Sequence, residues 1–189
     1  MSGFGDIPPG TVFAAALHCG TAFLLVSAAI PKLRNPLAFT GVVANYRILP
    51  HALSTPFARL LPFVEIALAA GLLLPMTSGW AALASALLLL VFALAMEINI
   101  FRGRTAIDCG CRGDEMRQRL RPALVWRNIA WAFLLMISQF AAPLAYSSTM
   151  GIATFALALV AGGVFFLLYQ VLERVWSIPA LKRNRHAGG

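Results

Sequence analysis

The sequence predicts an all-α membrane protein: a four-helix transmembrane bundle with a fifth transmembrane helix and an interfacial helix. Hydrophobic residues make up 60% of the 189-residue chain and charged residues only 12%, whereas a soluble domain is about half apolar and a quarter charged. Several apolar runs approach the ~20 residues that cross a hydrocarbon core, and they lack the alternation of a strand barrel. Because the bilayer core offers no water to backbone groups, each span should be a helix.

The sequence indicates where the helix of the first span should end. Pro31 and Lys32 follow its apolar run, and we expect the helix to end there because proline breaks helices and cations resist burial. The second span contains Pro62 and one acid, Glu65, and ends at Pro75 before a tight turn. The predicted spans cover residues 12–30, 57–74, 80–100, 123–142 and 151–172 of a single membrane domain, residues 1–189.

Two further segments complete the prediction. Residues 37–49, between the first two spans, place apolar side chains at helical spacing with Arg47 near the end, which is typical of a helix lying in the membrane interface. Residues 173–189 form a basic tail, which we expect to be disordered at Lys182–His186. Residues 1–11 lack the positive region of a cleaved signal peptide, so we interpret the first span as retained.

The cations indicate an orientation. With five spans, all 15 Lys and Arg residues fall on one side of the membrane. By the positive-inside rule the N-terminus is then periplasmic and the C-terminus cytoplasmic, with residues 102–121 at the cytoplasmic face. The net charge of +8 does not indicate nucleic-acid binding, because no basic surface interleaved with aromatic residues is present.

Cys109-Gly110-Cys111 is the stretch that most suggests chemistry. Two thiols separated by one glycine can close a small disulfide ring, and strained, accessible disulfides are the labile kind. Nearby Arg102 and Arg104 would favour the reactive thiolate. A redox-active pair is the favoured interpretation. A structural disulfide and a metal site are the alternatives, although two thiols supply only half of the four ligands that zinc usually takes.

The third cysteine, Cys19, lies beside His18 inside the first span. Cys19 precedes Ile30 by 11 residues, or about 16 Å at about 1.5 Å per residue, so direct pairing with the loop cysteines is not expected. A small buried thiol is the favoured interpretation, because unpaired cysteine packs as a small hydrophobe. For His18, packing or an interfacial hydrogen bond is favoured over catalysis.

A set of polar residues is predicted beneath the cysteine loop. Glu65 is an acid within a span, which makes it a candidate functional residue because burying a charge in a bilayer is costly. Glu97 and Asn99 reach the same level from the third span, as do Arg127 and Asn128 from the fourth. The set is either a structural network that ties helices together or a proton relay or quinone headgroup site, since thiol oxidation releases protons. No motif in the sequence is specific enough to identify a quinone site.

Short motifs along residues 11–142 carry a family resemblance. In chain order they are Lys32-Leu33 with Pro36, Tyr46-Arg47-Ile48-Leu49-Pro50, Leu61-Pro62-Phe63-Val64-Glu65, Asp108-Cys109-Gly110-Cys111 and Arg127-Asn128. In this order they resemble the methylamine utilisation protein MauE family, which is related to the DoxX-like membrane proteins. The most specific element is the Cys-Gly-Cys loop together with the Arg-Asn pair downstream.

The resemblance implies a bacterial inner-membrane protein that assists maturation of methylamine dehydrogenase. Its implied partners are a thioredoxin-like protein, membrane-anchored or periplasmic, and the immature small subunit of that enzyme. Cys109 and Cys111 match the family's thiols and Glu65 its acid. Arg112 departs from the family, which commonly has an aromatic residue there. The implied substrate is periplasmic, whereas the cation count places the loop in the cytoplasm, and we give the cation count more weight.

The sequence thus predicts a membrane factor for thiol-disulfide redox or maturation, in which Cys109 and Cys111 exchange electrons and Glu65 gives intramembrane support. Two alternatives remain open. One is a non-catalytic membrane scaffold or chaperone for a thioredoxin-like partner. The other is a heavy-metal carrier that uses His18, Cys19 and the cysteine pair.

Overall fold

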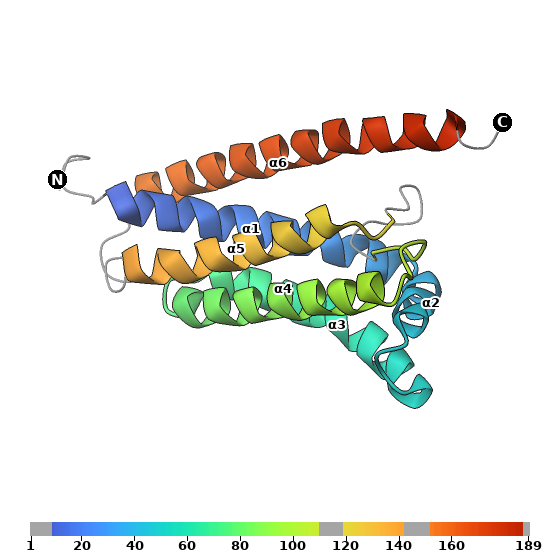
Figure 1. Cartoon of the computed structure of the whole chain (residues 1–189). Coiled ribbons are helices and arrows are strands. Elements are labelled where there is room, and N and C mark those ends of the chain that lie inside the picture. The colour runs from blue at the N-terminus through green and yellow to red at the C-terminus, as the bar shows by residue number, and fades with distance from the viewer. Residues whose placement is uncertain (1–8, 110–118, 142–151, 187–189) are drawn as a thin grey trace.

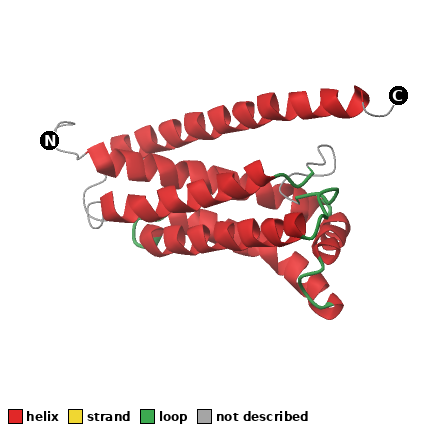
Figure 2. Cartoon of the chain, in the orientation of Figure 1, coloured by secondary structure: helices red, strands yellow, loops and turns green. Residues whose placement is uncertain are grey.

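Helices account for nearly all of the described chain. The structure, a computed structural model, describes residues 9–109, 119–141 and 152–186. The helices found there are α1 (Pro9–Arg34), α2 (Pro36–Tyr46), α3 (His51–Leu73), α4 (Ser78–Phe101), α5 (Pro122–Ala141) and α6 (Ile152–His186) (Figures 1 and 2). All but α2 are long and apolar enough to cross a membrane. The predicted class, an all-α protein with several membrane spans, is confirmed.

Helix α1 does not end where the sequence predicts. It continues through Pro31 to Arg34, and the backbone N–H of Asn35 still donates to the carbonyl of Pro31 at 3.0 Å. Proline is tolerated in membrane helices because neighbouring groups and local adjustments satisfy the carbonyl it leaves without a donor. The extra turn makes Lys32 part of the helix, where it is buried, rather than part of an exposed loop.

A short helix lies between the first two spans, as predicted. Helix α2 starts because the side chain of Asn35 accepts a hydrogen bond from the N–H of Ala38 at 3.3 Å and Pro36 occupies the first turn. It ends at Arg47, whose left-handed backbone (φ 48°) reverses the chain. Figure 1 places α2 at the end of the bundle where α1 finishes.

Helix α3 begins at His51, earlier than the predicted start at residue 57. Its interior contains Pro56 and Pro62, each of which removes one helical hydrogen bond and permits a bend. In Figure 1 the first turns of α3 splay away from the bundle. The tight turn to α4 closes with the N–H of Ser78 donating to the carbonyl of Leu74 at 2.9 Å.

Alanine supplies half of the core shared by α1, α3, α4 and α5. Membrane helices gain little from the hydrophobic effect, so small residues that allow close approach are favoured at their interfaces. A tryptophan from α5, Trp131, adds a polar link by donating from its indole N–H to the hydroxyl of Thr21 at 2.9 Å. The core residues are Leu17, Ala22, Leu25, Ala69, Leu72, Ala81, Ala82, Ala86, Leu89, Trp131, Ala132 and Leu135.

Helix α6 packs along α1 (Figure 1), and Gly20 of α1 meets Gly162 of α6 at this contact. A Cβ added at Gly162 would lie 2.6 Å from the Cβ of Cys19 and 2.7 Å from the backbone N of Gly20, so only glycine fits there. Cys19 is fully buried in this seam beside Ala158. It therefore packs as a small hydrophobe, the interpretation the sequence favours.

The basic tail is helical for most of its length. Helix α6 runs to His186 without a break in the assigned helix, so the expectation of a disordered segment at Lys182–His186 is wrong. The apolar spanning part of this helix ends at Glu173. Beyond it the helix extends past the other helices, toward the end of the bundle that carries α2 (Figure 1).

Candidate functional site

The base of the cysteine loop is fastened to the end of α4. Gly103 adopts a positive φ of 70°, which lets the chain turn sharply after the helix. Arg104 then binds back to Asn99 twice, through its backbone N–H to the Asn99 carbonyl at 2.9 Å and through its guanidinium to the side-chain oxygen at 3.3 Å. The N–H of Leu120 donates to the carbonyl of Ile107 at 3.2 Å. This hydrogen bond joins the chain segment that enters the loop to the segment that leaves it, two residues before Cys109.

Cys109 is buried at this base, with 8% of its surface exposed. It packs with Met96 from α4, with Leu120 just before α5 and with Leu124 in the first turn of α5. Its carbonyl accepts a hydrogen bond from the hydroxyl of Tyr46, at the end of α2, at 3.2 Å. Residues of α2, α4 and α5 thus hold Cys109, the first thiol of the predicted pair, in place. Cys111 and Arg112 lie outside the described residues.

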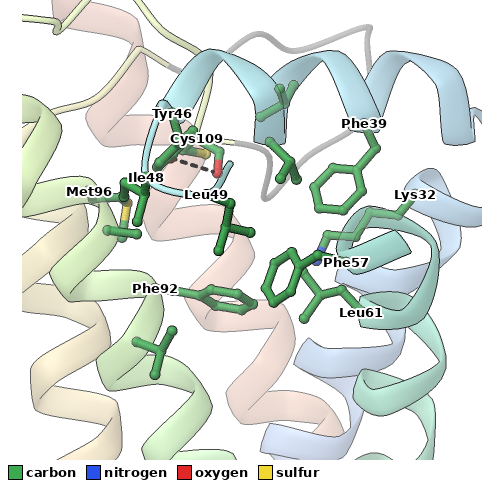
Figure 3. A pocket seen from close by; sticks show the side chains of 14 residues that line it. Lys32, Phe39, Tyr46, Ile48, Leu49, Phe57, Leu61, Phe92, Met96 and Cys109 are labelled. Carbon is green, nitrogen blue, oxygen red and sulfur yellow. Dashed lines mark hydrogen bonds between the residues drawn. The ribbon is translucent and has the colours of Figure 1, made fainter. Parts of the chain in front are cut away.

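An apolar cavity of about 200 Å³ lies next to Cys109, between α2, α3 and α4 (Figure 3). In Figure 3, Cys109 and Tyr46 lie at one end, and Lys32, Phe39 and Phe57 at the other. The cavity is lined by Lys32, Phe39, Val42, Val43, Tyr46, Ile48, Leu49, Phe57, Leu61, Val91, Phe92, Ala95, Met96 and Cys109. Apolar and aromatic walls with a few polar groups are typical of small-molecule sites.

Lys32 and Glu65 form a buried ion pair between α1 and α3. The Lys32 ammonium contacts the Glu65 carboxylate, and their side chains are 5% and 0% exposed. The same ammonium lies 5.2 Å from the ring centre of Phe39 and 5.5 Å from that of Phe92, within the range of cation–π attraction. The pair therefore places an ammonium group, whose charge the Glu65 carboxylate balances, at the end of the apolar cavity away from Cys109.

A second, more polar cavity of about 80 Å³ adjoins the other side of this ion pair. Arg127 on α5 binds Glu173 on α6 at 2.7 Å and the side-chain oxygen of Asn128 at 3.2 Å, and these three residues line the cavity together with Lys32 and Glu65. The Lys32–Glu65 pair thus separates an apolar cavity near Cys109 from a polar cavity beneath α6.

The structure divides the polar set that the sequence groups together. Glu65, Arg127 and Asn128 meet at the polar cavity. Asn99 belongs instead to the base of the cysteine loop, where it holds Arg104 and donates to the carbonyl of Ala95 at 3.0 Å. Glu97 is half-buried and makes no hydrogen bond or ion pair that we find among the described residues.

Sequence reasoning missed Lys32, Tyr46 and Glu173 as members of the site. A signal for Lys32 existed, because an acid inside a span needs a partner and Lys32 is a cation at the end of the preceding span. Glu173 could have been sought in the same way as a partner for Arg127. Nothing in the sequence marks Tyr46 as the residue that reaches the cysteine loop.

His18 belongs to a different region of the bundle. Its Nε2 lies 3.3 Å from the hydroxyl of Ser138 and 3.1 Å from the amide nitrogen of Gln139, both on α5. Cys19 lies in the α1–α6 seam and Cys109 in the cluster at the loop base. In the parts of the chain that the structure describes, no three His, Cys, Asp or Glu side chains gather as a metal site would need.

Fold and site together define a class: a multi-span helical membrane protein in which the base of a cysteine loop is held at one end of the bundle, beside a cavity within the helices. The profile of the family described as "Methylamine utilisation protein MauE" matches residues 10–141. The chain belongs to the MauE family.

Curated relatives extend the match over most of the chain. The methylamine utilization protein MauE of Methylorubrum extorquens is 43% identical over 145 residues, which is 77% of both chains. The proteins of the same name from Paracoccus denitrificans and Paracoccus versutus are both 42% identical, covering 92% and 87% of this chain and 93% and 88% of theirs. No solved structure matches the chain significantly.

Proposed function

We propose that this protein is a membrane thiol-disulfide redox factor that serves maturation of the methylamine dehydrogenase small subunit. Membership of a methylamine utilisation family supports the metabolic setting. Cys109 and Cys111 are the exchanging pair, a thioredoxin-like protein is the partner, and Glu65, Arg127 and Asn128 are supporting polar residues.

The observation that carries the proposal is the position of Cys109. A structural disulfide serves to fasten a loop, but this loop base is already fastened by Asn99, Arg104 and Tyr46 through hydrogen bonds. A redox pair, in contrast, needs one sulfur held in place while its partner sulfur is attacked. Burial of Cys109 to 8% exposure suits the role of the held sulfur.

The proposed exchange balances without any further reagent. A thiolate of the thioredoxin-like partner attacks one sulfur of the Cys109–Cys111 disulfide and forms a mixed disulfide, releasing the other sulfur as a thiolate. The second thiol of the partner then attacks the mixed disulfide. The partner leaves oxidised by two electrons, and Cys109 and Cys111 are left as two thiols.

The proposed orientation follows the cations, with the N-terminus periplasmic and the C-terminus cytoplasmic. Burial of Lys32 removes one of 15 cations from the count and leaves the bias unchanged. The loop then faces the cytoplasm, where the thiols of a membrane-anchored partner must reach it, because the exchange needs direct contact between sulfur atoms. Labelling the loop cysteines with a membrane-impermeant maleimide, from each side of oriented vesicles, tests this. Labelling from the periplasmic side alone would show that the orientation is reversed.

Replacement of the cysteines tests the function itself. Cys109→Ser and Cys111→Ser, in a host that depends on the protein for methylamine growth, should each abolish active methylamine dehydrogenase while the membrane protein accumulates normally. Cys19→Ala is the matched control, because Cys19 packs between helices and should be dispensable. Normal enzyme in both loop variants would reject the redox role and leave a scaffold or chaperone as the explanation.

A further inference from the structure

We propose that the apolar cavity between α2, α3 and α4 binds the ring of a membrane-soluble quinone, which accepts electrons from the Cys109–Cys111 dithiol. This inference rests on the proposed redox function and names its electron acceptor. The cavity and Cys109 are in direct contact, since Cys109 is one of the lining residues.

The size and walls of the cavity suit a single flat ring. Its volume of about 200 Å³ falls below the roughly 300–1,000 Å³ of sites that enclose drug-sized ligands. Phe39, Phe57 and Phe92 contribute aromatic rings to its walls (Figure 3). Aromatic side chains hold a flat ring by offset or edge-to-face contacts.

The cavity is reached from the lipid. Its lining residues Phe57 and Val91 are 39% and 46% exposed, and they belong to α3 and α4, both long and apolar enough to span a membrane. A ligand dissolved in the bilayer can therefore enter between α3 and α4 and leave an apolar tail among the lipids. A quinone with an isoprenoid tail has this form.

The ammonium group at one end distinguishes a quinone from a lipid chain. Lys32 lies at this end, and Tyr46 lies at the other beside Cys109, to whose carbonyl its hydroxyl donates (Figure 3). A 1,4-quinone carries a carbonyl at each end of its ring, and an ammonium group stabilises the negative charge that forms on a carbonyl oxygen during reduction. A buried ammonium would gain nothing from a hydrocarbon chain, because such a chain accepts no hydrogen bond.

The electrons and protons balance between the two reactants. Cys109 and Cys111 lose two electrons and two protons as their S–S bond forms. The quinone gains both electrons and two protons, and its two carbonyls become the hydroxyls of a hydroquinone. The Lys32–Glu65 pair, which adjoins the polar cavity, is placed to exchange a proton with the quinone oxygen at that end.

Oxidation kinetics test the acceptor role. The full-length protein, purified in detergent without endogenous quinone and fully reduced, is mixed with decylubiquinone while quinone absorbance and remaining thiols are recorded. We expect one quinone reduced per two thiols lost. Ala95→Phe, which fills the cavity, should slow the reaction roughly tenfold or more. Leu94→Phe is the control, because residue 94 is 61% exposed on the outer side of the same helix and does not line the cavity.

A binding measurement separates this inference from the redox function. A photoreactive azidoquinone should label the α4 segment 91–96 even in the Cys109→Ser/Cys111→Ser double variant. Excess decylubiquinone should displace this labelling. The measurement does not use the Ala95→Phe variant, so it remains informative even if that variant misfolds. Absence of displaceable labelling there overturns the inference, and the redox function stands if the cysteine variants still lose active enzyme. Labelling without thiol-dependent quinone reduction also overturns it.

Discussion

The buried ion pair between Lys32 and Glu65 gives the sharpest prediction for stability. It joins α1 to α3, and both side chains are almost fully buried, so bulk water does not compensate for a missing partner. We consider Lys32→Met, Glu65→Leu and the double variant that combines them. Each single change leaves one charge inside the bundle without the opposite charge that balances it.

Breaking a buried pair by removing one partner costs about 3–5 kcal/mol, whereas apolar replacement of both partners is often neutral. We expect each single variant to lose about 3 kcal/mol of stability, the lower value. The unfolded chain also stays in the membrane, where its polar side chains find other partners. This corresponds to a fall of roughly 150-fold in the unfolding equilibrium. The double variant should be more stable than either single variant.

Unfolding in mixed micelles, followed by the circular dichroism of the helices as sodium dodecyl sulfate is added, measures these free energies. Glu97→Gln is the matched control, since Glu97 is a half-buried acid for which we find no ion pair in the described residues, and it should change stability by less than about 0.5 kcal/mol. Additive losses in the double variant would refute the coupling. So would a loss in Glu97→Gln as large as that in Glu65→Leu.

Two further predictions concern the helix seam and the cysteine loop. Gly162→Ala should destabilise the protein by about 1–3 kcal/mol, because its Cβ would meet backbone atoms of α1. Gly163→Ala is the control and should leave the free energy of unfolding nearly unchanged in the same assay. Equal losses in the two variants would contradict the close packing of Gly162 against α1. Tyr46→Phe removes a hydrogen bond to Cys109 of about 0.5–1.5 kcal/mol, so in a Cys111→Ser background maleimide should alkylate Cys109 roughly 2- to 12-fold faster. An unchanged rate would show that Tyr46 does not hold the loop.

Most of the fold could be predicted because the bilayer leaves few choices. An apolar run of about 20 residues has to satisfy its own backbone, so it becomes a helix whatever its neighbours are. Helix ends are less determined, as Pro31 and Lys182–His186 show: the first helix continues through its proline, and the last continues into its basic end. Whether a breaking residue ends a helix depends on neighbours that the local sequence does not specify.

The site could be predicted only where a local motif carries it. The Cys109-Gly110-Cys111 stretch stands out by composition alone, and Glu65 stands out as an acid in a span. The partner of Glu65 did not stand out, because Lys32 follows a proline and has the sequence features of a loop cation. The grouping of Glu97 and Asn99 with Glu65 assumed that equal depth means contact. Helix rotation decides which side chains of one level face each other.

The sequence by itself therefore determined that this is a helical membrane protein with two neighbouring thiols in a polar loop, since composition and short motifs are local properties. Only the tertiary structure decided that Lys32 neutralises Glu65, that Tyr46 from a separate helix holds Cys109, and that an apolar cavity lies between them. These features arise where helices distant in the chain pack side by side. Their rotation and separation come from the fit of many small side chains, which no single segment encodes.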